Sequence, residues 1–195
     1  MKNCLLIGVG GQGTILASKL IAQAAMDKGL HALTTETIGM AQRGGSVVSH
    51  VRIGKGIYSP LIPYRTADLI IGFEPAEAVR ALPFLKDNGM LIVSSKAVMP
   101  VTSALSGNTY DSREMLAFLK NKVKNLVIID TEDICNQCGS SKVANVALLG
   151  AAGEAKVLDI TRKDFEDTIN RLLPGKFIEM NLKALNLGAA GGKNK

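Results

Sequence analysis

Short apolar runs alternate along the chain with segments in which apolar residues recur every three or four positions. Residues 2–9 form an apolar run that ends at glycine, which is typical of a buried strand. From Thr14 onward, apolar side chains return at helical spacing until Gly29, a residue suited to a helix C-terminus. Residues 31–37 predict a second strand. The chain therefore begins with a β-α-β unit.

The same alternation continues to the end of the chain. Further strands are predicted at 46–53, 67–73, 89–95 and 125–130. Further helices are predicted after Glu74-Pro75, from Asp111, around 142–152, after Thr161 and at 176–188. The pattern predicts an α/β fold, namely a three-layer α/β/α Rossmann-like domain with a mostly parallel sheet.

Neither an internal repeat nor an interdomain linker interrupts this pattern. We therefore expect a single domain over residues 1–188. Residues 189–195 are rich in glycine and end the chain, so they are expected to form a flexible C-terminal tail.

The composition is that of an ordinary globular protein, and it limits the classes of partner that we expect. Its 195 residues suffice for one sizeable domain. The net charge is +6, but the basic residues are scattered and rarely interleaved with aromatic ones, so nucleic-acid binding is not expected. No apolar run approaches the roughly 20 residues of a membrane span, and the first residues do not resemble a signal peptide. We therefore expect a cytoplasmic protein that does not associate with membranes.

The three cysteines raise the question of whether the chain takes part in redox chemistry or binds a metal. Cys135 and Cys138 form a C-x-x-C pair, whereas Cys4 lies alone in the first predicted strand. A zinc site or a four-cysteine cluster needs a second ligand pair at suitable spacing, which is missing, so no bound metal is expected. A thioredoxin-type pair begins a helix after a strand, and the sequence before Cys135 leaves that geometry open. Two incidental thiols on a helix are the favoured interpretation.

The first predicted strand is followed by Gly8-x-Gly10-x-x-Gly13, the form of the dinucleotide-binding fingerprint. The glycines allow a tight turn and a close approach of phosphate, and the helix N-terminus attracts an anion. Glu36 stands roughly where a ribose-binding acid belongs. Binding of NAD or FAD is therefore one hypothesis, and a turn that the glycines merely permit is the other.

A second unusual loop, residues 39–45, follows the second predicted strand. Arg43 stands there among small residues, so backbone can approach a ligand while the guanidinium stays available for bidentate contact with phosphate or carboxylate. The next strand places Ser46, His50 and Arg52 on one face. A simple turn with a solvated arginine, and a histidine that only makes structural hydrogen bonds, are the alternatives.

The two loops together resemble a known family. The segment "GVGGQGTILASKLIAQAA" followed by "ETIGMAQRGGSVVSHVRIG" resembles the gamma-type subunit or domain of 2-oxoacid:ferredoxin oxidoreductases, and most of all the beta subunits of the indolepyruvate ferredoxin oxidoreductases. The likeness covers nearly the whole chain, including "ADLIIGFEPAEAVRAL", "YSPLIP" and "KVANVALLGA". The run Met40–Gly45 with Ser49–Arg52 is far more specific than a lone glycine fingerprint.

The resemblance implies an oxidative decarboxylation. In that family, thiamine diphosphate attacks a 2-oxoacid, electrons pass through iron–sulfur clusters to ferredoxin, and the acyl group leaves as a coenzyme A thioester. This chain has too few cysteines for a four-cysteine cluster and lacks the Gly-Asp-Gly signature of thiamine enzymes. The resemblance implies that a larger alpha subunit holds thiamine diphosphate, magnesium and the clusters. The isolated chain is expected to be inactive. Without its partner, a homodimer is one alternative for its oligomeric state.

The expected ligand and interface site consists of the two loops, at the carboxyl ends of neighbouring strands, facing the partner and its coenzyme A. Arg43 is the first candidate for contact with an anionic group, Arg52 the second, and His50 a weaker one. Asn145 lies in a segment that also matches the family. Its alternative role is purely structural, namely to join a helix to a loop. The candidates are Gly10, Gly11, Gln12, Gly13, Gln42, Arg43, Gly44, Gly45, His50 and Arg52. No catalytic residue and no metal ligand is assigned.

The competing hypotheses are a stand-alone NAD- or FAD-binding oxidoreductase and a module that binds coenzyme A. The preferred substrate is an aryl pyruvate such as indolepyruvate, because the match is strongest at Ala41-Gln42-Arg43 and the chain stands alone as a small subunit.

Overall fold

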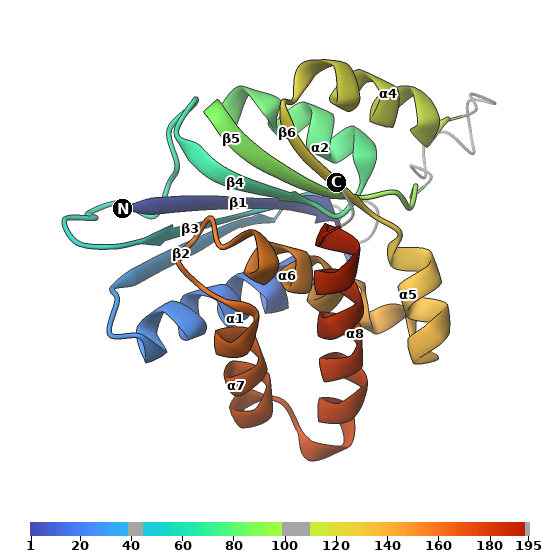
Figure 1. The fold of residues 1–195 in the computed structure, drawn as a ribbon. Coiled ribbons are helices and arrows are strands. Elements are labelled where there is room, and N and C mark those ends of the chain that lie inside the picture. The colour runs from blue at the N-terminus through green and yellow to red at the C-terminus, as the bar shows by residue number, and fades with distance from the viewer. Residues whose placement is uncertain (39–44, 99–109, 194–195) are drawn as a thin grey trace.

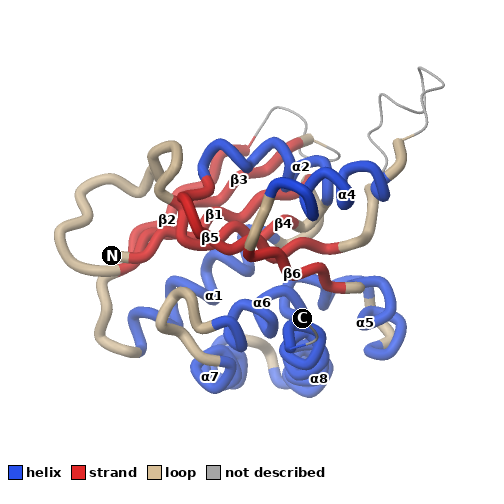
Figure 2. The backbone as a smooth tube through the Cα atoms, turned by 45° about the horizontal axis from the view of Figure 1, so that its top comes forward, coloured by secondary structure: helices blue, strands red, loops and turns tan. Residues whose placement is uncertain are grey.

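The computed structural model describes residues 1–38, 45–98 and 110–193. A central sheet lies between two layers of helices (Figures 1 and 2), which confirms the predicted α/β/α class. The strands are β1 (Lys2–Val9), β2 (Ala32–Ile38), β3 (Ser46–Ile53), β4 (Ala67–Gly72), β5 (Leu85–Ser94) and β6 (Asn125–Ile129). None of the helices in these ranges is long and apolar enough to cross a membrane.

The helices follow the predicted order along the chain. They are α1 (Thr14–Asp27), α2 (Pro75–Ala81), α4 (Ser112–Lys122), α5 (Thr131–Cys138), α6 (Ala144–Ala155), α7 (Arg162–Leu172) and α8 (Gly175–Lys193). Two short 3-10 turns, η1 (Leu82–Phe84) and η2 (Ser141–Val143), precede β5 and α6. Glu74 caps α2, because its side chain accepts a hydrogen bond from the backbone N–H of Glu77.

The sheet has the order β2-β3-β1-β4-β5-β6 and is mostly parallel, as predicted. β3 is the exception, since it runs antiparallel to both of its neighbours, β1 and β2. The pairs β1–β4, β4–β5 and β5–β6 are parallel. The carboxyl ends of β1, β2, β4, β5 and β6 therefore lie along one edge of the sheet, together with the beginning of β3.

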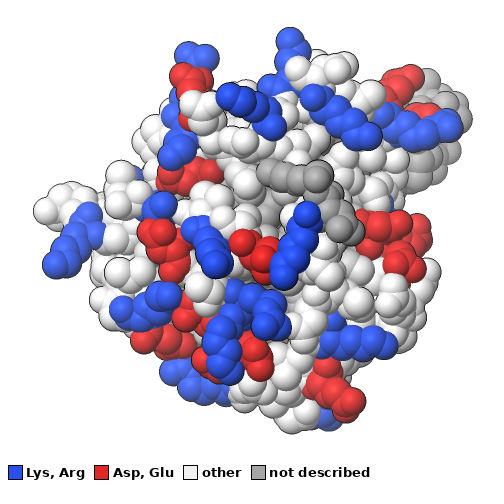
Figure 3. Space-filling model, in the orientation of Figure 1, with Lys and Arg blue, Asp and Glu red and all other residues white. Residues whose placement is uncertain are grey.

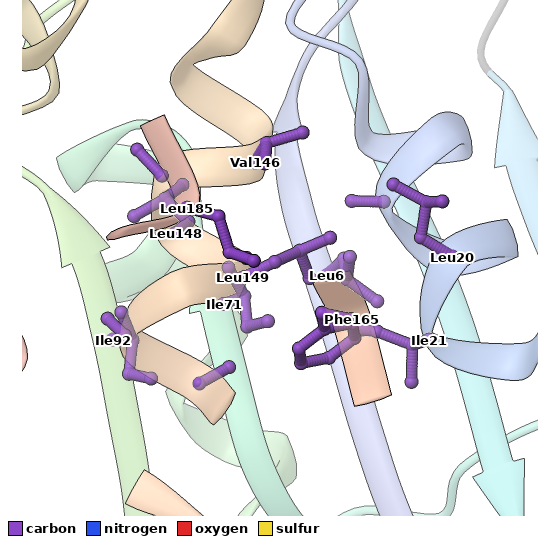
Figure 4. Packing of buried hydrophobic residues seen from close by; sticks show 14 of the residues in the cluster. Leu6, Leu20, Ile21, Ile71, Ile92, Val146, Leu148, Leu149, Phe165 and Leu185 are labelled. Atoms are coloured by element: carbon purple, nitrogen blue, oxygen red, sulfur yellow. The ribbon is translucent and has the colours of Figure 1, made fainter. Parts of the chain in front are cut away.

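Two hydrophobic clusters bind the layers to the sheet. Helices α1, α5, α6, α7 and α8 cover one face, whereas α2 and α4 cover the other (Figure 2). Alternate residues of β1 point to opposite faces, so Leu6 belongs to the larger cluster and Leu5 to the smaller one. Figure 4 shows the larger cluster, in which Leu6 lies between Ile21 of α1 and Leu149 of α6.

The connections that follow β1 and β4 leave the sheet on opposite sides. The chain passes from β1 into α1 on one face and from β4 into α2 on the other. Ligands of open α/β sheets bind where neighbouring strands diverge in this way, at the carboxyl ends of the strands. The topology therefore places a candidate site between the ends of β1 and β4.

The C-terminal segment corrects one expectation. Residues 189–193 do not form a flexible tail, because α8 continues to Lys193 and Ala189 is buried. Gly188 lies against the backbone of Ala147 in α6, where a Cβ atom would collide with the Ala147 carbonyl oxygen. Small residues in this stretch allow two helices to pack closely, so here they indicate helix contact rather than mobility. Residues 194 and 195 lie outside the described residues.

Candidate functional site

The loop after β1 is fixed to β4 by the side chain of Gln12. Its Oε1 atom accepts a hydrogen bond from the Val9 N–H at 2.7 Å, and its Nε2 atom donates to the Phe73 carbonyl oxygen at 3.0 Å. Gly8 makes room for this arrangement, since a Cβ atom there would lie 2.6 Å from Gln12 Oε1. Gln12 therefore joins the two strand ends between which the sheet topology places a site.

Gly13 ends the loop and begins α1. Its φ angle of 81° lies in the left-handed region, which favours glycine. Its carbonyl oxygen accepts a hydrogen bond from Asn145 Nδ2 of α6 at 3.4 Å, while Asn145 Oδ1 accepts from the Val146 N–H. No side chain caps α1 at Gly13. The N–H groups and the positive end of the α1 dipole can therefore bind an anion.

A backbone hydrogen bond joins the two predicted loops at their described residues. The N–H of Gly10 donates a hydrogen bond to the carbonyl oxygen of Gly45 at 2.9 Å, next to the strand pair of Val9 with Ser46. They meet because β3 pairs antiparallel with β1, so the beginning of β3 lies beside the end of β1. Gln42, Arg43 and Gly44 lie outside the described residues.

Buried carboxylates lie beside this contact on the α2 face. Ser46 Oγ donates to Glu77 Oε2 at 2.6 Å, and Arg80 forms an ion pair with the same carboxylate. The hydroxyl of Tyr110 donates to Glu74, and burial next to that carboxylate raises the Tyr110 pKa. These contacts tie the beginning of β3 and the approach to α4 onto α2.

His50 and Arg52 do not lie at the two loops. They occupy the second half of β3, where His50 is paired with Leu5 and Arg52 with Asn3, towards the opposite edge of the sheet. His50 is buried, and its Nδ1 atom accepts a hydrogen bond from the Ile62 N–H at 3.2 Å. Arg52 donates to the carbonyl oxygens of Ser59 and Leu61. Both side chains thus hold the segment that follows β3.

A cavity of about 200 Å³ opens beside the glycine loop, over the ends of β4, β5 and β6. Gly11 and Gln12 line it from the loop, and Lys96 lines it from the segment after β5. On its floor, the hydroxyls of Ser94 and Thr131 share a hydrogen bond of 2.6 Å. Lys96 Nζ lies 3.3 Å from Glu132 Oε1 and is accessible to solvent. The cavity therefore offers hydroxyls and one ammonium group next to the N-terminus of α1.

Sequence reasoning missed the contribution of Lys96, Ser94 and Thr131 to this cavity. Each stands at or just after the carboxyl end of a buried parallel strand. The same rule that selected the two glycine-containing loops would have selected these positions, because ligands gather at the carboxyl ends of such strands.

The C-x-x-C pair does not have the thioredoxin geometry. α5 begins at Thr131, capped by Asp130, so Cys135 lies a full turn inside the helix and Cys138 is its last residue. Burial raises the pKa of the Cys135 thiol, whereas a reactive thiolate needs a lowered one. Within the described ranges, no group of three His, Cys, Asp or Glu side chains could hold a metal ion.

Comparison with known proteins shows the family of the chain. Residues 3–191 match the family model described as pyruvate ferredoxin/flavodoxin oxidoreductase. The chain therefore belongs to the pyruvate ferredoxin/flavodoxin oxidoreductase family, with the dimensions of a small subunit of a 2-oxoacid:ferredoxin oxidoreductase. It is 36% identical over 187 residues to the indolepyruvate oxidoreductase subunit IorB of Archaeoglobus fulgidus, which covers 95% of this chain and 92% of the relative.

Solved structures share the fold. The gamma subunit of a keto/oxoacid ferredoxin oxidoreductase from Geobacter sulfurreducens superposes with a TM-score of 0.72 at 24% identity, covering 98% of both chains. The 2-oxoglutarate:ferredoxin oxidoreductase of Magnetococcus marinus, solved with coenzyme A bound, superposes with a TM-score of 0.75 at 18% identity. That alignment covers the whole of this chain and 31% of the longer one. The fold therefore also occurs as one part of a larger polypeptide.

Proposed function

We propose that this chain is the small subunit of a cytoplasmic, thiamine diphosphate-dependent 2-oxoacid:ferredoxin oxidoreductase that converts an aryl pyruvate, with coenzyme A, into an acyl-CoA. A larger subunit holds the cofactors and passes electrons to ferredoxin. The small subunit contributes the paired loops, Gly10–Gly13 and Gln42–Gly45, to the channel for coenzyme A. The full-length similarity to IorB supports the choice of an aryl pyruvate.

The hydrogen bond between Gly10 and Gly45 carries this proposal. It brings the end of the arginine-containing loop to the N-terminus of α1, where backbone N–H groups point outward. Phosphate groups of coenzyme A are anions, and both a helix N-terminus and a guanidinium bind such groups. The adjacent cavity, which Lys96 lines, is continuous with the glycine loop at Gly11 and Gln12.

The chain's own residues do not fit the redox cofactors. Cys4 is buried in β1, Cys135 is buried in α5, and three cysteines cannot ligate a four-cysteine cluster. Thiamine diphosphate would supply the carbanion chemistry, and the clusters would supply the electron path, from the larger subunit. The role of this chain is to bind and orient the coenzyme A chain and to close the channel against water.

The position of Glu36 counts against the dinucleotide alternative. β3 lies between β2 and β1, so Glu36 stands two strand spacings, about 10 Å, from β1 rather than one. Its Oε1 atom already accepts a hydrogen bond from Ser18 of α1 at 3.3 Å. A ribose bound at the glycine loop therefore has no acid within ordinary hydrogen-bonding reach on the next strand.

Anaerobic co-expression with the larger subunit tests the proposal. The complex should reduce ferredoxin in the presence of indolepyruvate and coenzyme A, and the isolated chain should show no turnover. Arg43→Ala should raise the KM for coenzyme A about 10-fold or more, as expected for loss of a charge-assisted phosphate contact. Arg162→Ala, which removes a partly exposed arginine of α7 that bonds to Asn186, is the matched control and should leave that KM unchanged.

Two results would contradict the proposal. Turnover of an oxoacid by the isolated chain would show that the chain is not merely an accessory subunit. Tight binding of NAD, NADP or FAD to the isolated chain in calorimetry would instead support the dinucleotide alternative.

A further inference from the structure

A surface at the opposite edge of the sheet from the two loops has the features of a protein interface. The segment 54–66 connects β3 with β4 at that edge and contains neither helix nor strand. In Figure 1 it extends beyond the sheet beside the N-terminus. The segment is nevertheless fixed: Arg52 Nη1 donates to the carbonyl oxygen of Ser59 at 2.8 Å and to that of Leu61 at 3.2 Å.

Further contacts fix the middle and the end of this segment. His50 Nδ1 accepts from the Ile62 N–H, and the side chain of Ile62 is buried. Asn3 Nδ2 donates to the Thr66 carbonyl oxygen at 2.9 Å, just before β4. Side chains from β1 and β3 therefore hold the backbone of residues 59–66.

This fixed backbone presents large apolar side chains to solvent. Tyr58 is 97% exposed, Tyr64 is 68% exposed and Leu61 is 56% exposed. Tyrosine is enriched at protein interfaces, where its rigid side chain buries a large area at a small cost in conformational entropy. Because the backbone is already ordered, association would lose little further entropy. We call these three side chains, with Lys55 and Arg65, the docking face.

The charge of the surroundings indicates the chemistry of the partner. Residues 52–66 contain Arg52, Lys55 and Arg65 but no acidic residue. The Tyr64 ring contacts the Phe84 ring of η1 at a centroid distance of 4.6 Å, which links the docking face to the next surface.

Beyond η1 lies a groove of about 350 Å³ between the start of β5 and the end of α4. Leu82, Leu85 and Phe118 line it, and its charged lining residues are Lys86, Lys122, Lys124 and the one acidic residue Asp87. Figure 3 shows basic side chains gathered over α4 along the upper margin of the molecule, with few acidic ones among them. An apolar centre with a basic margin matches a partner surface that has an apolar centre and an acidic margin.

We propose that the docking face binds an acidic-rimmed apolar surface of the larger subunit, an inference that rests on the proposed function. Tyr58, Leu61 and Tyr64 supply the apolar anchors, and Lys55 and Arg65 supply the charge match. Arg52 and His50 are positioning residues that keep the anchors in place. The paired loops stay open to coenzyme A, because they lie at the other edge of the sheet.

The test uses the co-expressed complex and the affinity of the small subunit for the larger one. Replacing Tyr58, Leu61 and Tyr64 together by serine should weaken binding about 100-fold or more, as loss of interface anchors does. The control replaces Met26 and Leu172, exposed apolar residues of α1 and α7, by serine and should bind like the wild type. Circular dichroism and thermal unfolding verify that each variant is folded.

A second pair of variants keeps the test valid if the triple variant fails to fold. Lys55→Glu with Arg65→Glu should weaken binding about 10-fold or more at low salt and less at high salt. Arg52→Lys should weaken binding too, because a single ammonium nitrogen cannot replace both the Nε bond to Asn3 Oδ1 and the Nη1 bonds to the carbonyl oxygens of Ser59 and Leu61.

The outcomes separate this inference from the proposed function. If the wild-type complex is active and the triple variant assembles with unchanged affinity, the docking face is refuted while the proposed function stands. If the isolated wild-type chain is a dimer that the triple variant abolishes while the complex persists, the occupant is a second copy and the inference is wrong. If no thiamine-dependent complex forms with the wild type, both fail.

Discussion

The N–H of Gly10 and the carbonyl oxygen of Gly45 form a hydrogen bond of 2.9 Å that joins the glycine loop after β1 to the beginning of β3. A backbone contact of this kind does not depend on any side chain at either position. Its geometry depends on the neighbours that hold each loop, namely Gln12 and Asn145 on one side and Ser46 on the other. These neighbours are therefore the positions at which substitution should disturb the site.

Gly13→Ala should lower the free energy of unfolding by more than its backbone conformation alone predicts. A left-handed φ costs about 1–2 kcal/mol for an L-residue. In addition, the new Cβ atom would lie 2.6 Å from Asn145 Nδ2. Gly29→Ala is the matched control, since it has a φ of 74° but no neighbour within 4 Å. Urea unfolding of both variants measures the difference, and equal losses would contradict the contact with Asn145.

Ser46→Ala should loosen the beginning of β3. The substitution removes the hydroxyl that donates to the buried Glu77 carboxylate, and a hydrogen bond to a charged group contributes about 1.5–3 kcal/mol. Glu77→Gln retains an acceptor oxygen for Ser46 and should cost less. We expect the Ser46→Ala complex also to show a raised KM for coenzyme A with little change in kcat. Unchanged unfolding and unchanged KM would show that this tie has no part in holding the loop.

Gly188→Ala should destabilise the chain strongly, because Gly188 lies where α8 packs closely against α6, directly before the residues predicted to form a tail. A Cβ atom at this position would collide with the Ala147 carbonyl oxygen, and overpacking a well-packed contact costs about 1–3 kcal/mol. Gly175→Ala, at the beginning of the same helix and with no neighbour within 4 Å, is the control and should be neutral or slightly stabilising. Thermal unfolding distinguishes the two. A neutral Gly188→Ala would refute the close packing of α8 against α6.

The architecture could be predicted because buried strands leave a clear signal. Every residue of β4 is buried and, apart from Asp68, its sequence is an apolar run. The antiparallel direction of β3 could not be predicted in the same way. Parallel and antiparallel strands share the period of two, and the residues of β3 alternate in either case. The glycines near the C-terminus were misinterpreted because close helix packing and chain mobility favour the same small residues.

The sequence predicted those parts of the candidate site whose residues stand close together along the chain. Gly10 and Gly45 stand in two short, unusual segments, and the structure brings them together. Lys96 and Thr131 follow two different strands and meet only at the edge of the folded sheet, so the strand-end rule could mark each position but no motif spacing joins them. Arg52 shares a strand face with Ser46, but the strand is long enough to place its guanidinium beyond reach of the loops.

In the His50→Gln variant, the free energy of unfolding should fall less than in the wild type as the pH is lowered. Burial lowers the pKa of His50 below its ordinary value of 6.5, so the folded state binds fewer protons than the unfolded state as the pH falls below that value. Its stabilising contribution is therefore complete above about pH 6.5 and is lost progressively below it. Urea unfolding between pH 5 and 8 should show a steeper loss for the wild type than for His50→Gln. His31→Gln, an exposed position, serves as the control; parallel curves for wild type and His50→Gln would contradict the prediction.

Cys135 should react slowly with iodoacetamide near neutral pH. The thiolate is the reactive species, and burial raises the thiol pKa above its ordinary value of 9.0, although the positive charge of Lys96 opposes this effect. The alkylation rate, followed by mass spectrometry, should rise with pH and still be rising at pH 9, and at pH 7 it should stay below the rate for glutathione. Cys135→Ala should leave the ferredoxin-reducing activity of the complex intact. Alkylation of Cys135 at pH 7 faster than that of glutathione would instead indicate a reactive thiolate beside the cavity, and with it a redox role for the C-x-x-C pair.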